Sequence, residues 1–346
     1  MSKRLISILQ YVVFLGGGIF LVWWQLKGMT ADQKTQFISA LRNANYWLIV
    51  PIIFMSLLSH LSRAYRWKLL LEPLEYYPKI KNVFAVTMVG YLANAAFPRL
   101  GEVLKCTFLS KYEHIKVDKL VGSILIERTF DLLCFVIFIG ITVLIQVDKI
   151  GGFIKEKIIS FEENAVIPIW AKGLIVFGII MLIYYLLKFL VKKYPGNKTI
   201  FKINNFFKGI GEGFTAIRSL KKRNLFIAHT LFIWAMYLLQ IYVGFKAMEH
   251  TLELDLRAAC SVLVLASFAM IITPNGIGLF PIFVMQTLVL YGVNSSYGYS
   301  FGWLIWGVAT SIILIVGFIC LLLLPYINKI KNENNTGYTG EDIYIR

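Results

Sequence analysis

Long apolar runs alternate with short polar segments along the chain. The runs long enough to cross a lipid bilayer occupy about residues 5–26, 45–61, 120–147, 167–187, 225–246 and 301–326. A helix needs about 20 apolar residues to span the hydrocarbon core, because each residue adds only about 1.5 Å to its length. The pattern therefore predicts an all-α polytopic membrane protein with about six full spans.

Two further apolar stretches are too short to cross the bilayer. Residues 83–97 would form a helix of about 22 Å, against a hydrocarbon core of about 30 Å, before a break from Pro98 to Glu102. The second stretch, residues 258–273, is broken from Pro274 to Gly278. Since such a break must be sealed by protein or must line a wet cavity, we expect two re-entrant helical hairpins, over about residues 83–112 and 258–292.

The distribution of basic residues predicts which side each hairpin enters from. Both ends of the first hairpin are basic, and the residues concerned are Arg63, Arg66, Lys68, Lys79, Lys81, Lys105, Lys111, Lys116 and Lys119. Under the positive-inside rule these ends are cytoplasmic, as are the basic loop 188–224 and both termini. The second hairpin lacks the basic bias and is expected to enter from outside. Two broken hairpins of opposite direction predict an inverted repeat with a site near the membrane midplane.

Composition narrows the function classes. The 346 residues are 58% hydrophobic and 16% charged, which excludes a soluble domain. The net charge of +16 is spread between apolar runs rather than on a basic module, so we expect contact with anionic lipid headgroups and no nucleic acid. The four cysteines and four histidines are scattered, so neither a metal site nor a cofactor is indicated.

The chain is predicted to form one transmembrane domain over residues 1–331. The first apolar run follows Lys3 and Arg4 and lacks a cleavage site, so it is expected to remain as a span. Residues 332–346 are polar and are expected to be a disordered tail. The pattern leaves the oligomeric state open.

The run at 120–147 carries three ionisable residues, Glu127, Arg128 and Asp131. Glu127 and Asp131 share a helix face at a spacing of four, and Arg128 can bridge to Asp131 at a spacing of three. Charges at this depth usually mark a polar site that faces the interior of the bundle. The alternative is structural: the acids pair with Arg99 and Arg128 and fix the first hairpin to this helix.

The hairpin turns supply chemistry suited to an anion. Each returning arm begins a helix whose free N–H groups attract negative charge, and Gly101, Gly276 and Gly278 allow close backbone approach. Arg99 and Arg128 add donors that fit a phosphate, while the acids suit a cationic headgroup or a coupling proton. The predicted substrate-binding residues are Arg99, Gly101, Glu102, Glu127, Arg128, Asp131, Pro274, Gly276 and Gly278.

A basic and aromatic group follows the run at 45–61. Arg63 and Trp67 share a helix face, and Arg66 lies one turn from Arg63. Such side chains are favoured at the headgroup level, where arginine can snorkel and tryptophan can anchor a helix. We therefore expect Arg63, Arg66 and Trp67 to lie at the lipid headgroup interface.

Four motifs together resemble a known family. They are Arg63-x-x-Arg66-Trp67, Asn94 with Pro98-Arg99-Leu100-Gly101-Glu102, Glu127-Arg128-x-x-Asp131, and Pro274-x-Gly276-x-Gly278. In this order they resemble the flippase-like transmembrane domain of bacterial lysylphosphatidylglycerol synthases, and the resemblance covers most of residues 5–326. It implies a bacterial inner-membrane protein that moves phospholipid between leaflets, with a separate lipid-modifying enzyme as a candidate partner.

The chain departs from the family pattern at two positions. Arg99 follows Pro98 directly, where the family commonly has one residue between them. Leu279-Phe280-Pro281 stands where the second motif commonly continues into a glutamate, so the resemblance does not point to lysyl-phosphatidylglycerol in particular. Only residues 327–346 follow the last span, so the soluble aminoacyl-transferase domain of the full-length synthases is not expected.

Three functions remain open from the sequence. The first is a lipid transporter or flippase for an anionic or aminoacylated phospholipid, or for another lipid-linked phosphate. The second is a membrane-embedded transferase with Glu127 or Asp131 as general base, although no metal motif, nucleotide loop or nucleophile elbow supports it. The third is a scaffold subunit that transports nothing itself. The sequence favours a transporter over an enzyme.

Overall fold

In a computed structural model, the structure describes residues 22–97, 99–158 and 220–333, together with Gly16, Phe20 and Tyr185. Every regular element in these ranges is a helix, as the apolar pattern predicted. The predicted spans at 5–26 and 167–187, most of the basic loop 188–224, and the tail beyond residue 333 lie largely or wholly outside the described residues.

Four segments of the described chain are long and apolar enough to cross a membrane. They are Tyr46–Leu74, Val117–Gln146, Arg223–Phe245 and Ser295–Asn328. Their main helices are α3 (Ile49–Leu71), α6 (Val117–Ile158), α9 (Arg223–Phe245) and α12 (Ser295–Glu333). The prediction of a multi-pass helical membrane protein is confirmed.

Helix α3 is longer than the sequence pattern suggested. It continues through the basic group after Leu61 to Leu71, because no helix-breaking residue occurs until Pro73 in the short 3-10 helix η2 (Glu72–Leu74). The basic group therefore lies within a spanning helix rather than beyond its end. This shift places two arginines opposite the charged part of α6.

The short apolar stretches form two helical pairs. In the first, α4 (Ile80–Ala96) packs against α5 (Leu100–Glu113). In the second, α10 (Leu256–Ile272) is followed by the 3-10 turn η4 (Pro274–Gly276) and packs against α11 (Leu279–Val289). The remaining described elements are α2 (Ala31–Arg42), η1 (Tyr46–Leu48) and η3 (Glu249–Thr251).

The first hairpin is closed tightly at its turn. A Cβ atom on Gly101 would lie 2.0 Å from the carbonyl oxygen of Gly90, so only glycine permits this approach of α5 to α4. The Gly101 N–H donates to Asn94 Oδ1 over 2.8 Å, which caps the start of α5. At the other end, Glu113 Oε1 accepts from the Lys79 N–H over 3.2 Å. The pair α4–α5 is thus held at both ends.

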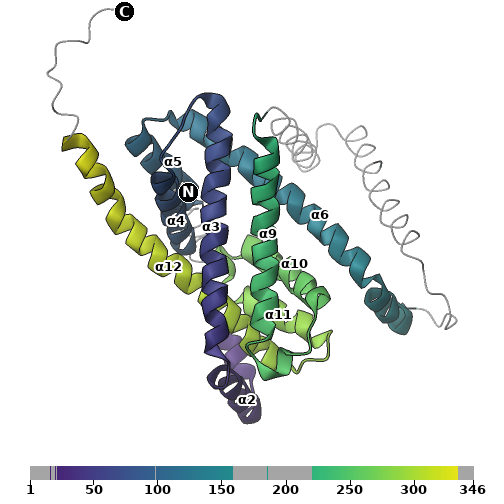
Figure 1. The fold of residues 1–346 in the computed structure, drawn as a ribbon. Coiled ribbons are helices and arrows are strands. Elements are labelled where there is room, and N and C mark those ends of the chain that lie inside the picture. The colour runs from purple at the N-terminus through teal and green to yellow at the C-terminus, as the bar shows by residue number, and fades with distance from the viewer. Residues whose placement is uncertain are drawn as a thin grey trace, which may run out of the picture.

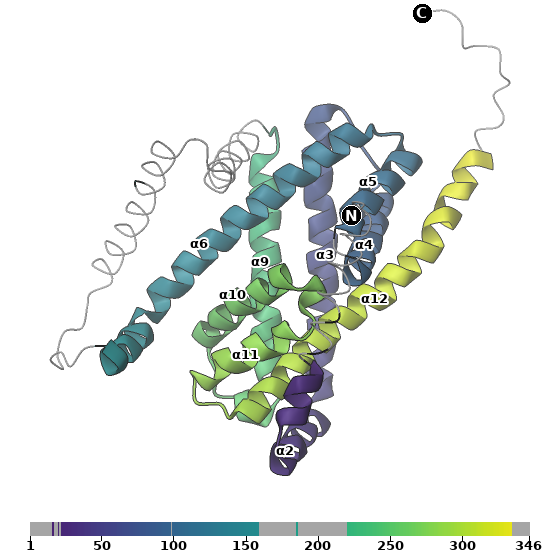
Figure 2. The same ribbon diagram turned by 180° about the vertical axis from the view of Figure 1, so that it is seen from behind.

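The two hairpins occupy opposite ends of the bundle. In Figures 1 and 2, α4 and α5 lie in the upper half and α10 and α11 in the lower half, while α3, α9 and α12 pass through both. Helix α12 contacts both hairpins: Gly317 lies against Leu92 of α4, and Gly302 lies against Pro281 of α11. The turn η4 contacts α4, so the second hairpin reaches the first near the middle of the molecule.

A buried charge cluster as the candidate functional site

The centre of the site is a set of ion pairs between α3 and α6. Arg63 Nη1 lies 2.7 Å from Asp131 Oδ2, and Arg66 Nη1 lies 2.7 Å from Asp131 Oδ1. Arg66 Nη2 lies 3.1 Å from Glu127 Oε1. The spacing of three on α3 and of four on α6 turns both arginines and both acids toward the same helix interface.

Helix α5 adds a lysine to this group. Lys105 Nζ lies 3.8 Å from Glu127 Oε2 and 4.3 Å from the centre of the Trp67 ring. Trp67 is fully buried, and its Nε1 donates to Ser123 Oγ over 2.9 Å. The lysine stem fits here because a Cβ on Gly90 would come within 2.5 Å of Lys105 Cγ. The first hairpin therefore carries a cation into the interior.

Helix α9 completes the site with neutral acceptors. Arg63 Nη2 donates to the Tyr237 hydroxyl over 3.0 Å, and Arg66 Nη1 donates to Thr230 Oγ1 over 3.3 Å. The Arg66 guanidinium also lies over the Phe226 ring, 5.6 Å from its centre. The guanidinium groups are therefore held by side chains of two helices, α6 and α9.

The buried charges do not balance. Arg63, Arg66 and Lys105 face the two carboxylates of Glu127 and Asp131, which leaves one positive charge in excess. Arg66 and Glu127 are 0% and 2% exposed, so water screens them little. The Nε atoms of both arginines, and Oε2 of Glu127, are buried without a hydrogen-bond partner in the described part of the chain. A site with excess positive charge and unused donors is suited to an anion.

A second, more exposed pair joins α6 to the first hairpin. Arg128 Nη2 lies 2.9 Å from Glu102 Oε1, and these side chains are 44% and 31% exposed. Asn94 Nδ2 also donates to Glu102 Oε1 over 3.3 Å. The expected bridge from Arg128 to Asp131 is replaced by this pair, because Asp131 is already held by two arginines of α3.

Arg99 and the second hairpin stand apart from the cluster. Arg99 is exposed at the turn before α5, with a φ of 67°, and has no ion-pair or hydrogen-bond partner among the described residues. In η4, Asn275 O accepts from Trp306 Nε1 over 2.7 Å and Asn275 Nδ2 donates to Thr310 over 2.9 Å. These bonds tie the second turn to α12, and within the described residues no hydrogen bond or ion pair links it to the charge cluster.

Comparison with known proteins identifies the family. The family model of the lysylphosphatidylglycerol synthase transmembrane region matches residues 7–317. The chain belongs to this family. The resemblance drawn from the four motifs is confirmed.

One relative of the chain is also described as a membrane protein. UPF0104 membrane protein MJ1595 of Methanocaldococcus jannaschii is 23% identical over 257 residues, which cover 70% of this chain and 74% of that protein. No solved structure matches the chain.

Within this family member, the side chains expected at the headgroup interface are enclosed by protein. Arg66 and Trp67 are fully buried and Arg63 is 12% exposed, while their level in the membrane stays a prediction. Their partners lie on α5, α6 and α9, which brings them into the same site as Glu127 and Asp131. The arginines are members of the charge cluster.

Lys105 is the functional candidate that sequence reasoning missed. It was counted only as a basic flank of the first hairpin, yet it is 2% exposed. The signal lay in its spacing: Lys105 follows Gly101 by four residues, so a helix places both on the face that packs against α4. A close glycine contact one turn away indicates that this face is buried.

Proposed function

We propose that this protein moves an anionic or aminoacylated phospholipid between the leaflets of a membrane. The headgroup passes the charge cluster while the acyl chains remain in the bilayer. The observation that carries the proposal is the excess buried positive charge of Arg63, Arg66 and Lys105 over Glu127 and Asp131. Buried charges inside a membrane protein mark substrate pathways.

The guanidinium groups suit the phosphodiester of such a lipid. Arginine presents a planar fork of donors that matches two phosphate oxygens, and the Nε atoms of Arg63 and Arg66 have no partner in the described residues. An incoming phosphate would take over donors now held by Asp131. The carboxylates it displaces would then face an amino group on an aminoacylated headgroup.

The two hairpins provide the moving parts in this proposal. They enter the membrane from opposite sides as re-entrant segments, and their turns close the pathway alternately. Arg99 receives the headgroup at the first turn, beside Gly101, Glu102 and Arg128. Pro274, Gly276 and Gly278 form the second turn, whose contact with α4 supports this arrangement. The protein resides in a bacterial inner membrane with both termini in the cytoplasm.

Arg99→Gln gives a sharp test because Arg99 has no ion-pair or hydrogen-bond partner in the described structure. The variant should fold normally and should lower the translocation of fluorescent phosphatidylglycerol in proteoliposomes at least fivefold, since one phosphate contact is lost. Arg42→Gln, an exposed arginine at the end of α2, is the matched control and should leave the rate unchanged. Wild-type protein that moves no lipid above the empty-liposome rate overturns the proposal and favours the scaffold.

A further inference from the structure

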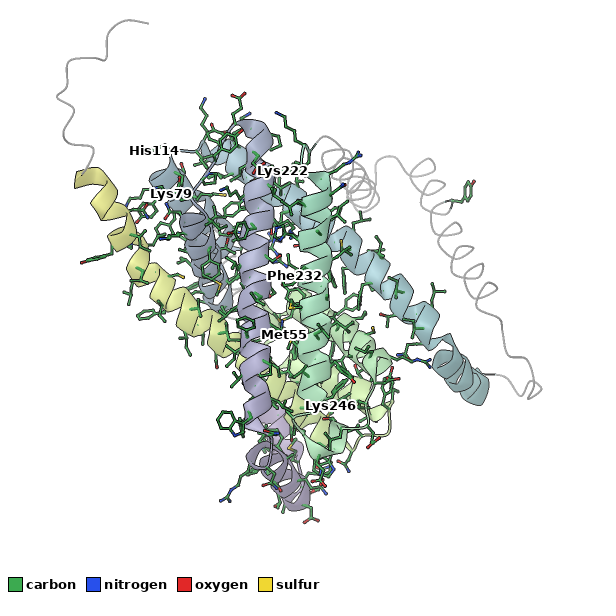
Figure 3. The ribbon with its side chains drawn as sticks, viewed as in Figure 1. Met55, Lys79, His114, Lys222, Phe232 and Lys246 are labelled. Carbon is green, nitrogen blue, oxygen red and sulfur yellow. The ribbon has the colours of Figure 1, made fainter. Side chains whose placement is uncertain are left out.

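A second polar site lies between α3 and α9, at residues next in sequence to the charge cluster but not part of it. These two helices enclose a groove of about 380 Å³. Its walls are the apolar side chains Leu58, Leu61, Tyr65, Leu225, Ala228 and Phe232. Figure 3 labels Phe232 on α9 beside α3. Ser62 and His229 are the polar residues of this lining.

The groove contains one hydrogen-bonded polar pair, Ser62 and His229. Ser62 Oγ lies 2.8 Å from His229 Nδ1 and 3.4 Å from the His229 carbonyl oxygen. When the Ser62 hydroxyl donates to Nδ1, the neutral ring carries its own hydrogen on Nε2, and this is the tautomer that the site proposed below requires. Tyr65 stacks on this ring, with centroids 5.8 Å apart and planes within 4° of parallel. Among the described residues, Nε2 has no hydrogen-bond partner, and in this tautomer it can donate to a ligand.

The position of His229 along α9 indicates what that ligand is. Leu225 of the groove lining lies three residues after Lys222, which Figure 3 labels at the start of α9. Lys222 Nζ is 3.0 Å from Glu72 Oε2, and Arg223 is exposed. Lysine and arginine at the end of a span lie at the level of lipid phosphates. His229 lies six residues further along α9, about 9 Å deeper, where the glycerol esters meet the acyl chains.

We propose that this groove binds one acyl chain and the adjoining glycerol ester of a diacyl phospholipid from the surrounding leaflet. The chain lies along Leu58, Leu61 and Phe232, and His229 Nε2 donates to the ester carbonyl. The phosphate lies near Arg223. The site does not depend on the proposed translocation, because a lipid can be held here whether or not headgroups cross the membrane elsewhere.

The test is photo-crosslinking in nanodiscs with a phosphatidylglycerol that carries a diazirine on one acyl chain. We expect the label on peptides that contain Leu61 and Phe232. Unlabelled diester phosphatidylglycerol should compete about three- to tenfold better than its diether analogue, which lacks the carbonyl acceptor. Equal competition by the two lipids, or label spread evenly over the exposed faces of the other spans, would overturn the proposal.

Two variants separate the hydrogen bond from the shape of the groove. His229→Phe keeps an aromatic ring against Tyr65 but removes the donor. The diester and diether lipids should then compete equally well. Ala228→Phe should fill the groove and remove most of the label. Ala235→Phe, at an exposed alanine outside the groove lining and two turns along the same helix, is the matched control and should keep the label. A diester preference that survives His229→Phe in protein with an unchanged melting temperature contradicts the assignment.

Discussion

Arg66 of α3 and Asp131 of α6 form an ion pair in which the arginine is fully buried and the acid is 17% exposed, with 2.7 Å between Nη1 and Oδ1. Arg63 binds the other oxygen of the same carboxylate, so one acid holds two arginines of a neighbouring helix. Removing this acid would leave both cations short of a partner inside the bundle. The pair therefore matters for stability as well as for the proposed site.

Asp131→Asn should destabilise the protein strongly. Breaking a buried ion pair by removing one partner costs about 3–5 kcal/mol, because the remaining charge stays buried and unpaired. Thermal unfolding in detergent should show a lower melting temperature. The double variant Asp131→Asn with Arg63→Gln restores the original excess charge and should recover part of the loss. An unchanged melting temperature for Asp131→Asn would contradict the burial of the pair.

Gly101→Ala should loosen the first hairpin. The added Cβ would lie 2.0 Å from the Gly90 carbonyl oxygen, and overpacking of this kind costs about 1–3 kcal/mol. Gly140→Ala on α6 is the control, because nothing lies within 4 Å of its Cβ position. The control should be neutral or stabilising by up to about 1 kcal/mol, since alanine favours a helix. Equal unfolding free energies for the two variants would show that α4 and α5 are not in contact at Gly101.

Lys105→Met should fold as well as the wild type or better. A buried charge replaced by an apolar side chain of similar length is often neutral or stabilising, and methionine fits the same space beside Gly90 and Trp67. Lys105→Arg is the contrasting variant: the wider guanidinium has no room against Gly90 and should lower the melting temperature. The prediction fails if the methionine variant unfolds well below the wild type.

The exposed pair Glu102–Arg128 should contribute far less than the buried pairs. Arg128 and Glu102 are 44% and 31% exposed, and in the proposed pathway they line a water-filled cavity. A double-mutant cycle with Glu102→Gln and Arg128→Gln should therefore give a coupling of about 0.2–1 kcal/mol. The coupling should also shrink as salt concentration rises. A salt-independent coupling above about 2 kcal/mol would place this pair in the protein interior instead.

The periodicity of the sequence predicted the helices and the broken hairpins better than it predicted the partners of the charges. Apolar length identifies a span such as α6, and proline and glycine identify the breaks, because these are local properties of the chain. The partner of Arg66 is 61 residues away on another helix, so local pattern could not distinguish a snorkelling arginine from a paired one. The apolar run ends at about Leu61, whereas α3 continues to Leu71 and so carries both arginines within the helix.

The burial of Lys105 could not be predicted from local sequence either. Its sequence neighbours are those of an ordinary basic flank, and only the approach of Gly90 and Gly101 creates the space that its stem fills. The excess charge of the cluster therefore became visible only when α4, α5 and α6 were placed together. Glu127 and Asp131 lie on the same face of α6, as predicted, because a spacing of four residues fixes this within one helix.

The most direct test of the account compares the translocation of anionic phosphatidylglycerol with that of zwitterionic phosphatidylcholine in proteoliposomes. Wild-type protein should move phosphatidylglycerol at least tenfold faster. Lys105→Met, which makes the cluster neutral, should remove most of this preference while the protein stays folded. Equal rates for the two lipids in the wild type, or an unchanged preference in the folded methionine variant, would contradict the claim that excess buried positive charge selects the substrate.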